Sequence, residues 1–170
     1  MLIVFSGLPG TGKTTLANAL AKASGALYLR IDSIEQAIRD AAVLIEDVGT
    51  SGYRVAGALA LANLRLGHRL VVDCVNPVAE SRRAWAEIAE QAGVALVDIQ
   101  VICSDPREHR RRVESRQADI PGLTPPDWQS VLNHDYQPWA EPPFTVDSAR
   151  LGVPEAVEAI LARLAAASVT

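Results

Sequence analysis

Gly7-Leu8-Pro9-Gly10-Thr11-Gly12-Lys13-Thr14 matches the phosphate-binding pattern G-x-x-x-x-G-K-[ST], and this match decides the fold of the 170-residue chain. The apolar residues 2–5 before the segment predict a strand, and residues 15–23 after it carry apolar side chains at helical spacing. Gly25 is placed to end that helix. A strand, a glycine-rich loop and a helix in this order are typical of a site for nucleotide phosphates.

The residue types of this segment suit a chain of phosphates. Glycine at positions 7, 10 and 12 lets main-chain N–H groups face phosphate oxygens, and the positive end of the following helix adds to the same site. We expect Lys13 to contact the β- and γ-phosphates as a catalytic residue, and the Thr14 hydroxyl to bind Mg²⁺. The predicted nucleotide-binding residues are Gly7, Leu8, Pro9, Gly10, Thr11, Gly12, Lys13, Thr14 and Thr15. The alternative is a glycine-rich turn with no ligand, which the flanking strand and helix disfavour.

Length and composition indicate one enzyme-sized α/β domain that covers residues 1–170. The hydrophobic fraction of 49% and the charged fraction of 21% are ordinary for globular proteins. No apolar run approaches the roughly 18 residues that span a bilayer, so we expect no membrane partner. The net charge of −4 disfavours a general nucleic-acid coat.

The two cysteines, Cys74 and Cys103, form no metal-binding motif. Each lies at the end of a different predicted strand, which disfavours a disulfide between them. The chain enters a core strand at once and shows no signal peptide. We therefore expect reduced thiols in a cytoplasmic protein.

Strand-like and helix-like segments alternate along the chain. Strands are expected at residues 2–6, 27–31, 69–73, 95–103 and 144–146. A helix is expected from Pro77 to Gln91 with Asn76 as its N-cap, a second opens with a capping box at Asp105, and the last begins near Pro154. This alternation predicts an α/β fold in which a parallel sheet carries helices on both faces.

The least regular stretch, residues 119–143, holds most of the prolines of the chain. Together with the segment before it, this stretch predicts a lid and irregular insertion over about residues 107–143, and not a linker to another domain. Trp128, Tyr136 and Trp139 are expected to pin the irregular segment to the core. The lining of an acceptor pocket is the alternative role for these aromatic residues.

Arginine is concentrated in one predicted helix, at Arg107, Arg110, Arg111, Arg112 and Arg116. Arg112 and Arg116 are four residues apart, so we expect them to share one helix face. The alternative is a solvent-exposed face on which the arginines pair locally with Glu108 and Glu114.

The chain resembles the P-loop kinase superfamily, and more closely the small ATP-binding proteins grouped with chloramphenicol phosphotransferase, gluconate kinase and the zeta-toxin kinases. The resemblance covers nearly the whole chain. It is carried by residues 7–15, Arg30-Ile31-Asp32-Ser33-Ile34, Val71-Val72-Asp73, Arg112-Val113-Glu114-Ser115-Arg116 and Thr145-Val146-Asp147-Ser148. It implies a three-layer α/β/α sandwich with a five-stranded parallel sheet of order 2-3-1-4-5 and a lid.

Asp73 follows the apolar run Leu70-Val71-Val72, as a Walker B aspartate does. In the implied order, its strand is next to the strand that leads into the phosphate-binding loop. The carboxylate is therefore expected close to Mg²⁺ and bound to it through water. An ordinary turn residue at a strand end is the alternative.

Asp32 ends the second predicted strand, two strands from the phosphate-binding loop in the implied order. With strands about 4.8 Å apart, it should lie about 10 Å to one side of the loop, where an acceptor hydroxyl must approach the γ-phosphate. In kinases of this resemblance, an aspartate at this place contacts the acceptor and takes its proton, so Asp32 is a candidate catalytic residue. Asp32-Ser33-Ile34-Glu35 is also a capping box, and one residue can serve both purposes.

The resemblance implies further roles in the second half of the chain. Arg112 and Arg116 match the lid arginines of P-loop kinases, which neutralise charge on the transferring phosphoryl group, so both are candidate catalytic residues. Asp147 follows the fifth predicted strand, in a loop that borders the adenine in the resembling families. The alternative for Asp147 is a loop residue near a helix start.

Together these residues predict an ATP-dependent kinase that uses Mg²⁺ and transfers the γ-phosphoryl group to a hydroxyl of a small-molecule acceptor. One alternative is a polynucleotide 5′-hydroxyl kinase, which needs a basic track for nucleic acid, and the acidic net charge counts against it. The other alternative is a nucleotide-binding regulator or weak ATPase with no phosphoryl acceptor. An acceptor-dependent rise in ADP release distinguishes the kinase from the regulator.

Overall fold

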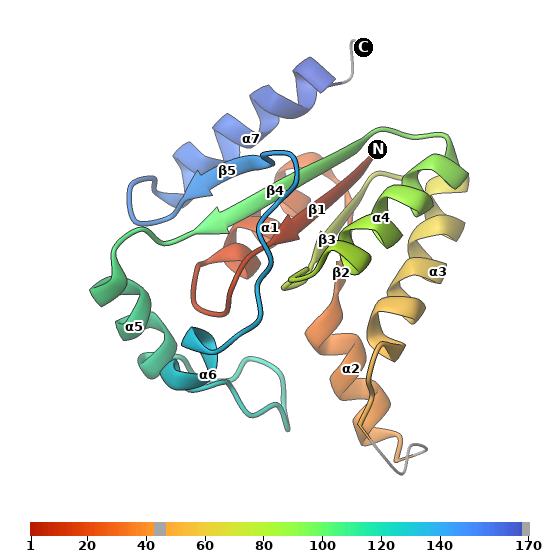
Figure 1. Ribbon diagram of the computed structural model, residues 1–170. Helices are drawn as coiled ribbons and strands as arrows, with labels where there is room; N and C mark the ends of the chain where they lie inside the picture. Colours follow the sequence, from red (N-terminus) through yellow and green to blue (C-terminus); the bar gives the residue numbers. More distant parts are fainter. Residues whose placement is uncertain (43–46, 168–170) are drawn as a thin grey trace.

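A parallel five-stranded sheet forms the centre of the protein (Figure 1). The computed structural model describes residues 1–42 and 47–167. The strands are β1 (Leu2–Ser6), β2 (Leu27–Arg30), β3 (Leu70–Asp73), β4 (Leu96–Ile102) and β5 (Phe144–Asp147). They pair in parallel in the order β2-β3-β1-β4-β5, so the predicted fold class and strand order are confirmed.

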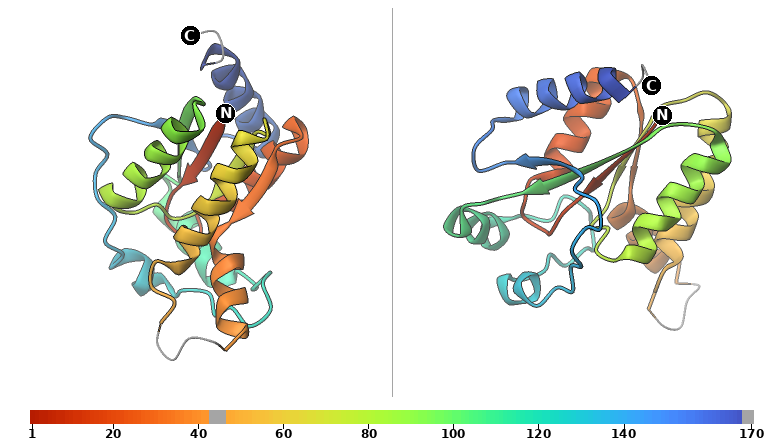
Figure 2. Two further views of the ribbon diagram at one scale, coloured as in Figure 1. Left: turned by 90° about the vertical axis from the view of Figure 1, so that its right-hand side faces the viewer. Right: turned by 45° about the horizontal axis from the view of Figure 1, so that its top comes forward.

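Helices cover both faces of the sheet. They are α1 (Lys13–Ser24), α2 (Ile31–Asp40), α3 (Ser51–Arg65), α4 (Ala79–Ala92), α5 (Pro106–Ser115), α6 (Trp128–Leu132) and α7 (Val153–Ala167). Helices α1 and α7 pack on one face and α3 and α4 on the other, which gives the predicted three layers (Figure 2). None of the helices in the described part of the chain has both the length and the apolar character needed to cross a membrane.

β1 is buried along its whole length, because it lies in the middle of the sheet between two helical layers. Its side chains alternate between the layers. Ile3 and Phe5 pack with α1 and α7, whereas Leu2 and Val4 pack with α3 and α4. A strand that is buried on both faces is an uninterrupted apolar run, which is why the sequence signals it so clearly.

β4 has one apolar face and one polar face. Val97 and Ile99 pack in the layer of α1 and α7, so Asp98 and Gln100 face the other side of the sheet. Residues 133–143 run along that side between α6 and β5, where they take the place of a covering helix (Figure 1).

Arg82 on α4 holds this irregular segment against the sheet. Its guanidinium donates hydrogen bonds to four main-chain carbonyl oxygens, those of Asn76, Pro77, Gln137 and Pro138. The same guanidinium lies over the rings of Tyr136 and Trp139, 5.2 Å and 4.1 Å from their centroids. These two aromatic residues therefore anchor the irregular segment, as predicted.

The predicted N-cap of the helix after β3 is wrong. Helix α4 begins at Ala79, and Asn76 does not cap it. Asn76 instead has a positive φ of 51° and a fully buried side chain, which donates to Ser6 Oγ and accepts from Ser81 Oγ. The need to satisfy these buried polar groups outweighs the preference of asparagine for a cap.

The predicted capping box at Asp32 is also wrong. β2 ends at Arg30, and α2 begins at Ile31 with Arg30 as its N-cap, so Asp32 lies inside the first turn. The Asp32 carboxylate forms an ion pair with Arg30, with 3.6 Å between Oδ2 and Nη2, and no side chain caps the helix. The cap predicted at Asp105 is confirmed, because its carboxylate accepts from two N–H groups of α5.

Asp98 should destabilise the native protein at neutral pH. Burial raises the pKa of its carboxyl to about 6 despite the nearby Arg82, and Oδ1 has no hydrogen-bond partner in the described part of the chain. Because this pKa exceeds that of an unfolded aspartate, the native state binds the proton more tightly and loses stability as the pH rises from 4 to 6. Asp98→Asn should therefore raise the free energy of unfolding by about 2 kcal/mol at pH 8, and the gain should vanish below pH 4.

Urea denaturation of both proteins at pH 4, 6 and 8 measures this difference. Asp135→Asn is the control, because Asp135 is an exposed aspartate on the irregular segment that runs along β4. A stability gain that is the same at every pH would contradict the assigned cause.

Candidate active site

The phosphate-binding loop between β1 and α1 is shaped by glycines with positive φ. Gly7 has a φ of 147° and Gly10 a φ of 83°. A Cβ atom at Gly7 would lie 2.4 Å from the carbonyl oxygen of Val101, and one at Gly10 would lie 2.4 Å from Cγ2 of Val113. Both glycines are therefore steric requirements of the loop, because any side chain would displace β4 or α5.

Two segments distant in sequence hold the loop in place. The Ser148 hydroxyl donates to the carbonyl oxygen of Thr11 at 2.6 Å, and Nε2 of His109 lies 2.8 Å from the carbonyl oxygen of Pro9. The ring of Trp128 packs edge-on against His109, with 5.1 Å between the ring centroids. Both polar contacts engage carbonyl oxygens, so they fix the loop without using the N–H groups that phosphate would need.

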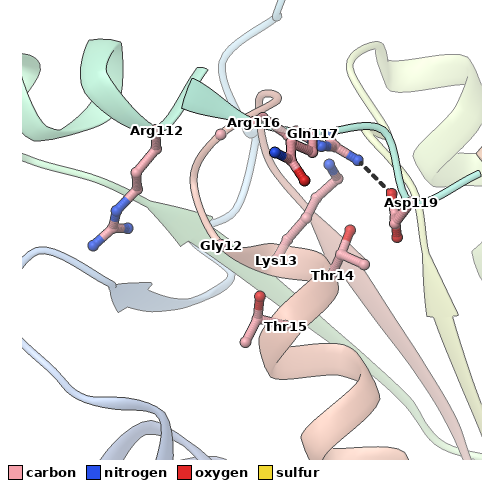
Figure 3. Close-up of a pocket in the computed structure, with 9 residues that line it drawn as sticks. Gly12, Lys13, Thr14, Thr15, Arg112, Arg116, Gln117 and Asp119 are labelled. Carbon is pink, nitrogen blue, oxygen red and sulfur yellow. Dashed lines mark hydrogen bonds and ion pairs between the residues drawn. The ribbon is translucent and has the colours of Figure 1, made fainter. Parts of the chain in front are cut away.

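Lys13 lies in a cavity of about 330 Å³ beside the loop (Figure 3). The cavity is lined by Gly10, Gly12, Lys13, Thr14, Thr15, Arg112, Arg116, Gln117 and Asp119. Lys13 is only 5% exposed, and its ammonium group makes no hydrogen bond or ion pair with the described residues. A buried charge without a partner is costly, so the cavity suits an anionic ligand.

The other residues predicted to bind nucleotide do not all line the same cavity. Gly10, Gly12, Thr14 and Thr15 share the Lys13 cavity. Gly7, Leu8 and Thr11 line a second, smaller cavity toward β4. The structure thus places Gly10, Gly12, Thr14 and Thr15 at the candidate phosphate site, whereas Gly7, Leu8 and Thr11 lie on the side of the loop that faces β4.

Arg112 and Arg116 contact different partners although they are four residues apart. Arg116 donates to Asp119 at 3.3 Å on the rim of the cavity. Arg112 points away from Lys13 (Figure 3) and donates to the Ser148 hydroxyl at 2.7 Å. The predicted shared helix face is wrong, because α5 ends one residue before Arg116, whose backbone is extended.

The other arginines of α5 are paired on the helix surface. Hydrogen bonds from Arg111 and Arg112 lower the pKa of Glu108 to about 2, so this carboxylate stays ionised and helps to hold Arg112. Arg110 forms an ion pair with Glu114 at 2.8 Å. For Arg110 and Arg111 the solvent-exposed alternative is confirmed.

Asp73 lies beside the loop and keeps one carboxylate oxygen free. The residue is 2% exposed, and its Oδ2 atom accepts from the Tyr28 hydroxyl at 2.8 Å. Its Oδ1 atom has no hydrogen-bond partner among the residues that the structure describes. A buried carboxylate oxygen without a partner fits a water molecule bound to Mg²⁺.

The rest of the donor set also suits a metal ion held mainly by phosphate. No group of three or more His, Cys, Asp or Glu side chains within residues 1–42 and 47–167 could hold a metal. An ion at this place would therefore depend on the Thr14 hydroxyl, on water held by Asp73 and on phosphate oxygens. Mg²⁺ prefers such a set, because it is an oxygen-binding ion that keeps several of its water ligands.

Arg30 is the charged residue of this site that sequence reasoning missed. Its side chain is 8% exposed, and its Nη1 and Nη2 atoms donate to both carboxylate oxygens of Asp119. Oxygens of Asp32 and Asp73 lie 3.6 Å and 3.8 Å from the same guanidinium. Asp32 does not line the cavity itself but reaches it through Arg30 and Asp119. A charged residue at the end of an apolar strand is the signal that could have found Arg30.

Burial and charge act in opposite directions on Arg30. Burial alone lowers the pKa of its guanidinium, but the hydrogen bonds to Asp119 and the three carboxylates raise it above its ordinary value. Arg30 is therefore a permanent cation at the edge of the site.

Asp147 connects two loops next to the phosphate-binding loop. Its Oδ1 atom accepts from the N–H groups of Ser104 at 3.0 Å and Ala149 at 3.1 Å, so its carboxylate joins the loops after β4 and β5. The carboxylate does not line the Lys13 cavity. Asp147 borders the loop through its neighbour Ser148, which contacts Thr11.

Residues 2–124 match the protein family described as AAA domain. The matched span contains the phosphate-binding loop, Arg30, Asp73, Arg112 and Arg116. The chain belongs to this family. The chain also has the strand order and the loop that the sequence predicted from its resemblance to the P-loop kinase superfamily.

Solved structures of kinases share the fold of this chain. A proposed kinase from Chloroflexus aurantiacus J-10-fl has a TM-score of 0.76 and 23% identity, over 98% of this chain and 96% of that one. A gluconokinase from Sinorhizobium meliloti 1021 has a TM-score of 0.64 and 24% identity, over 96% and 92%. The APS kinase CysC from Mycobacterium tuberculosis, in complex with AMPPNP and APS, has a TM-score of 0.68 and 18% identity, over 96% of both chains. These similarities confirm the fold of the P-loop kinases.

Loss of the Lys13 charge should abolish nucleotide-dependent stabilisation without weakening the free protein. At about 100 times its Kd, Mg·ATP should add about 2.7 kcal/mol to the free energy of unfolding. Lys13→Met should lose most of this gain, because the ammonium group that faces the phosphates is gone. Relief of a buried unpaired charge should leave the Tm of the free protein unchanged or higher. Thermal melts with and without Mg·ATP measure both effects.

Lys22→Met is the matched control, because Lys22 is exposed in the last turn of the same helix. Equal ATP-induced shifts in Lys13→Met, Lys22→Met and the wild type would refute the role of Lys13.

Asp73→Asn should raise the Mg²⁺ concentration that half-maximal ATP-induced stabilisation requires. An amide holds a metal-bound water less strongly than a carboxylate does. Tyr28→Phe is the control, because it removes the hydrogen bond to Oδ2 but keeps the carboxylate. Thermal melts at fixed ATP and increasing Mg²⁺ give the half-maximal concentrations. An Asp73→Asn curve that overlays the wild-type curve would exclude the Walker B role.

Proposed function

We propose that this protein is an ATP-dependent kinase that transfers the γ-phosphoryl group to a hydroxyl of a small-molecule acceptor. The main support is a continuous set of charged groups at one edge of the sheet. The Lys13 cavity contains Arg116 and Asp119, and Asp119 is bonded to Arg30. Arg30 in turn contacts Asp32, the candidate base. A phosphate site and a proton acceptor are thus neighbours.

The nucleotide half of the site uses the loop and the start of α1. The N–H groups of Gly10 and of residues 12–15, which line the cavity, and the positive end of the helix hold the β- and γ-phosphates. Lys13 supplies the countercharge from within the cavity. Mg²⁺, held by the phosphates, the Thr14 hydroxyl and water on Asp73, would withdraw charge from the transferring group.

Residues 107–143 form the lid of this single-domain kinase. Arg116 reaches the phosphate cavity and neutralises charge on the phosphoryl group during transfer. Arg112 lines the same cavity, but its guanidinium is bonded to Ser148, next to Asp147, and we assign Arg112 and Asp147 to the nucleoside end of the nucleotide. This division follows from the end of α5 between the two arginines.

Asp32 acts on the acceptor as a general base. Its carboxylate takes the proton of the acceptor hydroxyl while the hydroxyl oxygen forms a bond to the γ-phosphorus. The bond between the γ-phosphorus and the bridging oxygen breaks, and ADP leaves with that electron pair. The ion pair with Arg30 fixes the position of the carboxylate at the start of α2.

Two structural neighbours support a small-molecule acceptor. One is a gluconokinase, and the other is an APS kinase that holds AMPPNP and APS together. A polynucleotide acceptor would need a basic track. The exposed Arg110 and Arg111 are instead neutralised by Glu114 and Glu108 on the surface of α5.

A coupled assay of ADP release tests the activity with the wild-type protein. Sugars, antibiotics, nucleosides and oligonucleotide 5′ ends are compared at saturating Mg·ATP. A kinase of this class raises ADP release with at least one small molecule, and that molecule gains a phosphoryl group. Slow ADP release that no acceptor changes would indicate a weak ATPase or regulator, and stimulation by oligonucleotide ends alone would indicate a polynucleotide kinase.

Asp32→Asn should separate transfer from nucleotide binding. The change keeps the size of the side chain but removes its basicity, so phosphoryl transfer should fall by about 10² or more. The ATP-induced rise in Tm should persist, because Asp32 lies outside the Lys13 cavity. Both quantities are measured on the one purified variant.

Asp40→Asn is the control, because Asp40 is an exposed aspartate at the other end of the same helix. Near-normal transfer by Asp32→Asn would remove Asp32 from the mechanism and leave it as a partner of Arg30 alone.

A further inference from the structure

Arg30 forms an anion-binding fork that Asp119 fills. Two guanidinium nitrogens of Arg30 donate to the two carboxylate oxygens of Asp119, and Arg116 donates to one of these oxygens as well. Asp119 also lines the cavity of Lys13 and Thr14. One carboxylate is therefore held between two arginines at the edge of the Lys13 cavity, and Figure 3 shows its contact with Arg116.

The two partners of this ion pair are not equally fixed. Arg30 ends a strand of the central sheet and its side chain is 8% exposed. Asp119 lies between α5 and α6, outside any helix or strand, and its side chain is 53% exposed. A small movement of this connecting segment would uncover the fork, whereas the guanidinium would stay where the sheet holds it.

The charges around Arg30 allow an exchange of anions. Asp73 lies 3.8 Å from Nε, outside the fork, and Asp32 lies 3.6 Å from Nη2, too far for a hydrogen bond, so the hydrogen bonds of the two paired nitrogens go to Asp119. A ligand carboxylate in place of Asp119 would bring the same single negative charge to the fork, and a phosphate would bring up to one more. The planar fork of arginine matches both groups with two parallel hydrogen bonds.

We propose that Arg30 determines acceptor specificity, and that the acceptor carries a carboxylate or phosphate group near its reactive hydroxyl, which displaces Asp119 from the fork. This inference rests on the proposed kinase function. An anion on the fork lies beside Asp32, because Nη2 of Arg30 is 3.6 Å from Oδ2 of Asp32. The neighbouring hydroxyl of the same molecule would then face both the base and the Lys13 cavity. Asp119 then fills the Arg30 fork in the free protein, and an acidic acceptor replaces it there.

The fork can be tested with a probe that does not depend on the identity of the acceptor. Asp119→Ala opens the fork, and saturating Mg·AMPPNP fills the phosphate-binding loop. Acetate should then raise the Tm of Asp119→Ala, whereas acetamide, its neutral counterpart, should not. The difference between acetate and acetamide should be absent in the wild type, whose fork is filled. It should also be absent in the double variant Asp119→Ala/Arg30→Lys, which keeps the charge without the fork.

Equal effects of acetate and acetamide on Asp119→Ala would overturn the assignment of the fork. Arg30→Lys is preferred to an apolar replacement, because a buried site with three carboxylates needs a cation to fold. The ATP-induced shift in Tm of each variant shows whether its nucleotide site is intact.

A second experiment compares neutral sugars, the corresponding sugar acids and the corresponding sugar phosphates as acceptors in the ADP-release assay. The sugar acids or the sugar phosphates should give faster ADP release than the neutral sugars. The faster of these two classes identifies the anionic group that the fork binds. Arg30→Lys should raise the KM for that class tenfold or more, and Asp119→Asn should lower it.

Transfer to neutral sugars with a KM that Arg30→Lys leaves unchanged would overturn the inference while the kinase function stands. Absence of transfer to any compound, with an acetate effect still present on Asp119→Ala, would overturn the kinase function and leave the fork.

Discussion

Lys13 is a buried ammonium group without a carboxylate partner in the described part of the chain, and the site is arranged around this imbalance. An unpaired charge in a protein interior costs several kcal/mol, on the order of the entire stability margin of a small domain. The positive end of α1 and the guanidinium of Arg116 add to the same potential. A bound polyanion would neutralise this positive charge. The electrostatic cost in the free protein would then be relieved on binding and would add to the affinity.

The part of the fold that sequence could predict is the part in which one interaction dominates. β1 is buried on both faces, so its apolar run and the following glycine pattern fix the strand, the loop and the first helix. Asn76 and Asp32 were misjudged because both are good helix caps by local preference. In the structure Asn76 satisfies buried hydroxyl groups, and Asp32 pairs with a guanidinium that comes from the preceding strand. Tertiary partners of this kind have no signature in a local sequence window.

Arg112 and Arg116 show that a local sequence pattern can also fail within a single helix. A spacing of four residues places Arg112 and Arg116 on one face only as long as the helix continues past both. Helix α5 ends between them, so one arginine turns to Ser148 and the other to Asp119. Both side chains still line the Lys13 cavity, but each is held there by a different partner.

Charge is distributed unevenly across the edge of the sheet. On the side of the loop, Lys13 and Arg116 line the cavity with positive charge. On the side of β2, the carboxylates of Asp32, Asp73 and Asp119 surround Arg30. Without Arg30, these carboxylates would repel one another and the incoming nucleotide. The buried arginine therefore allows three carboxylates to lie within one salt-bridge network beside the Lys13 cavity.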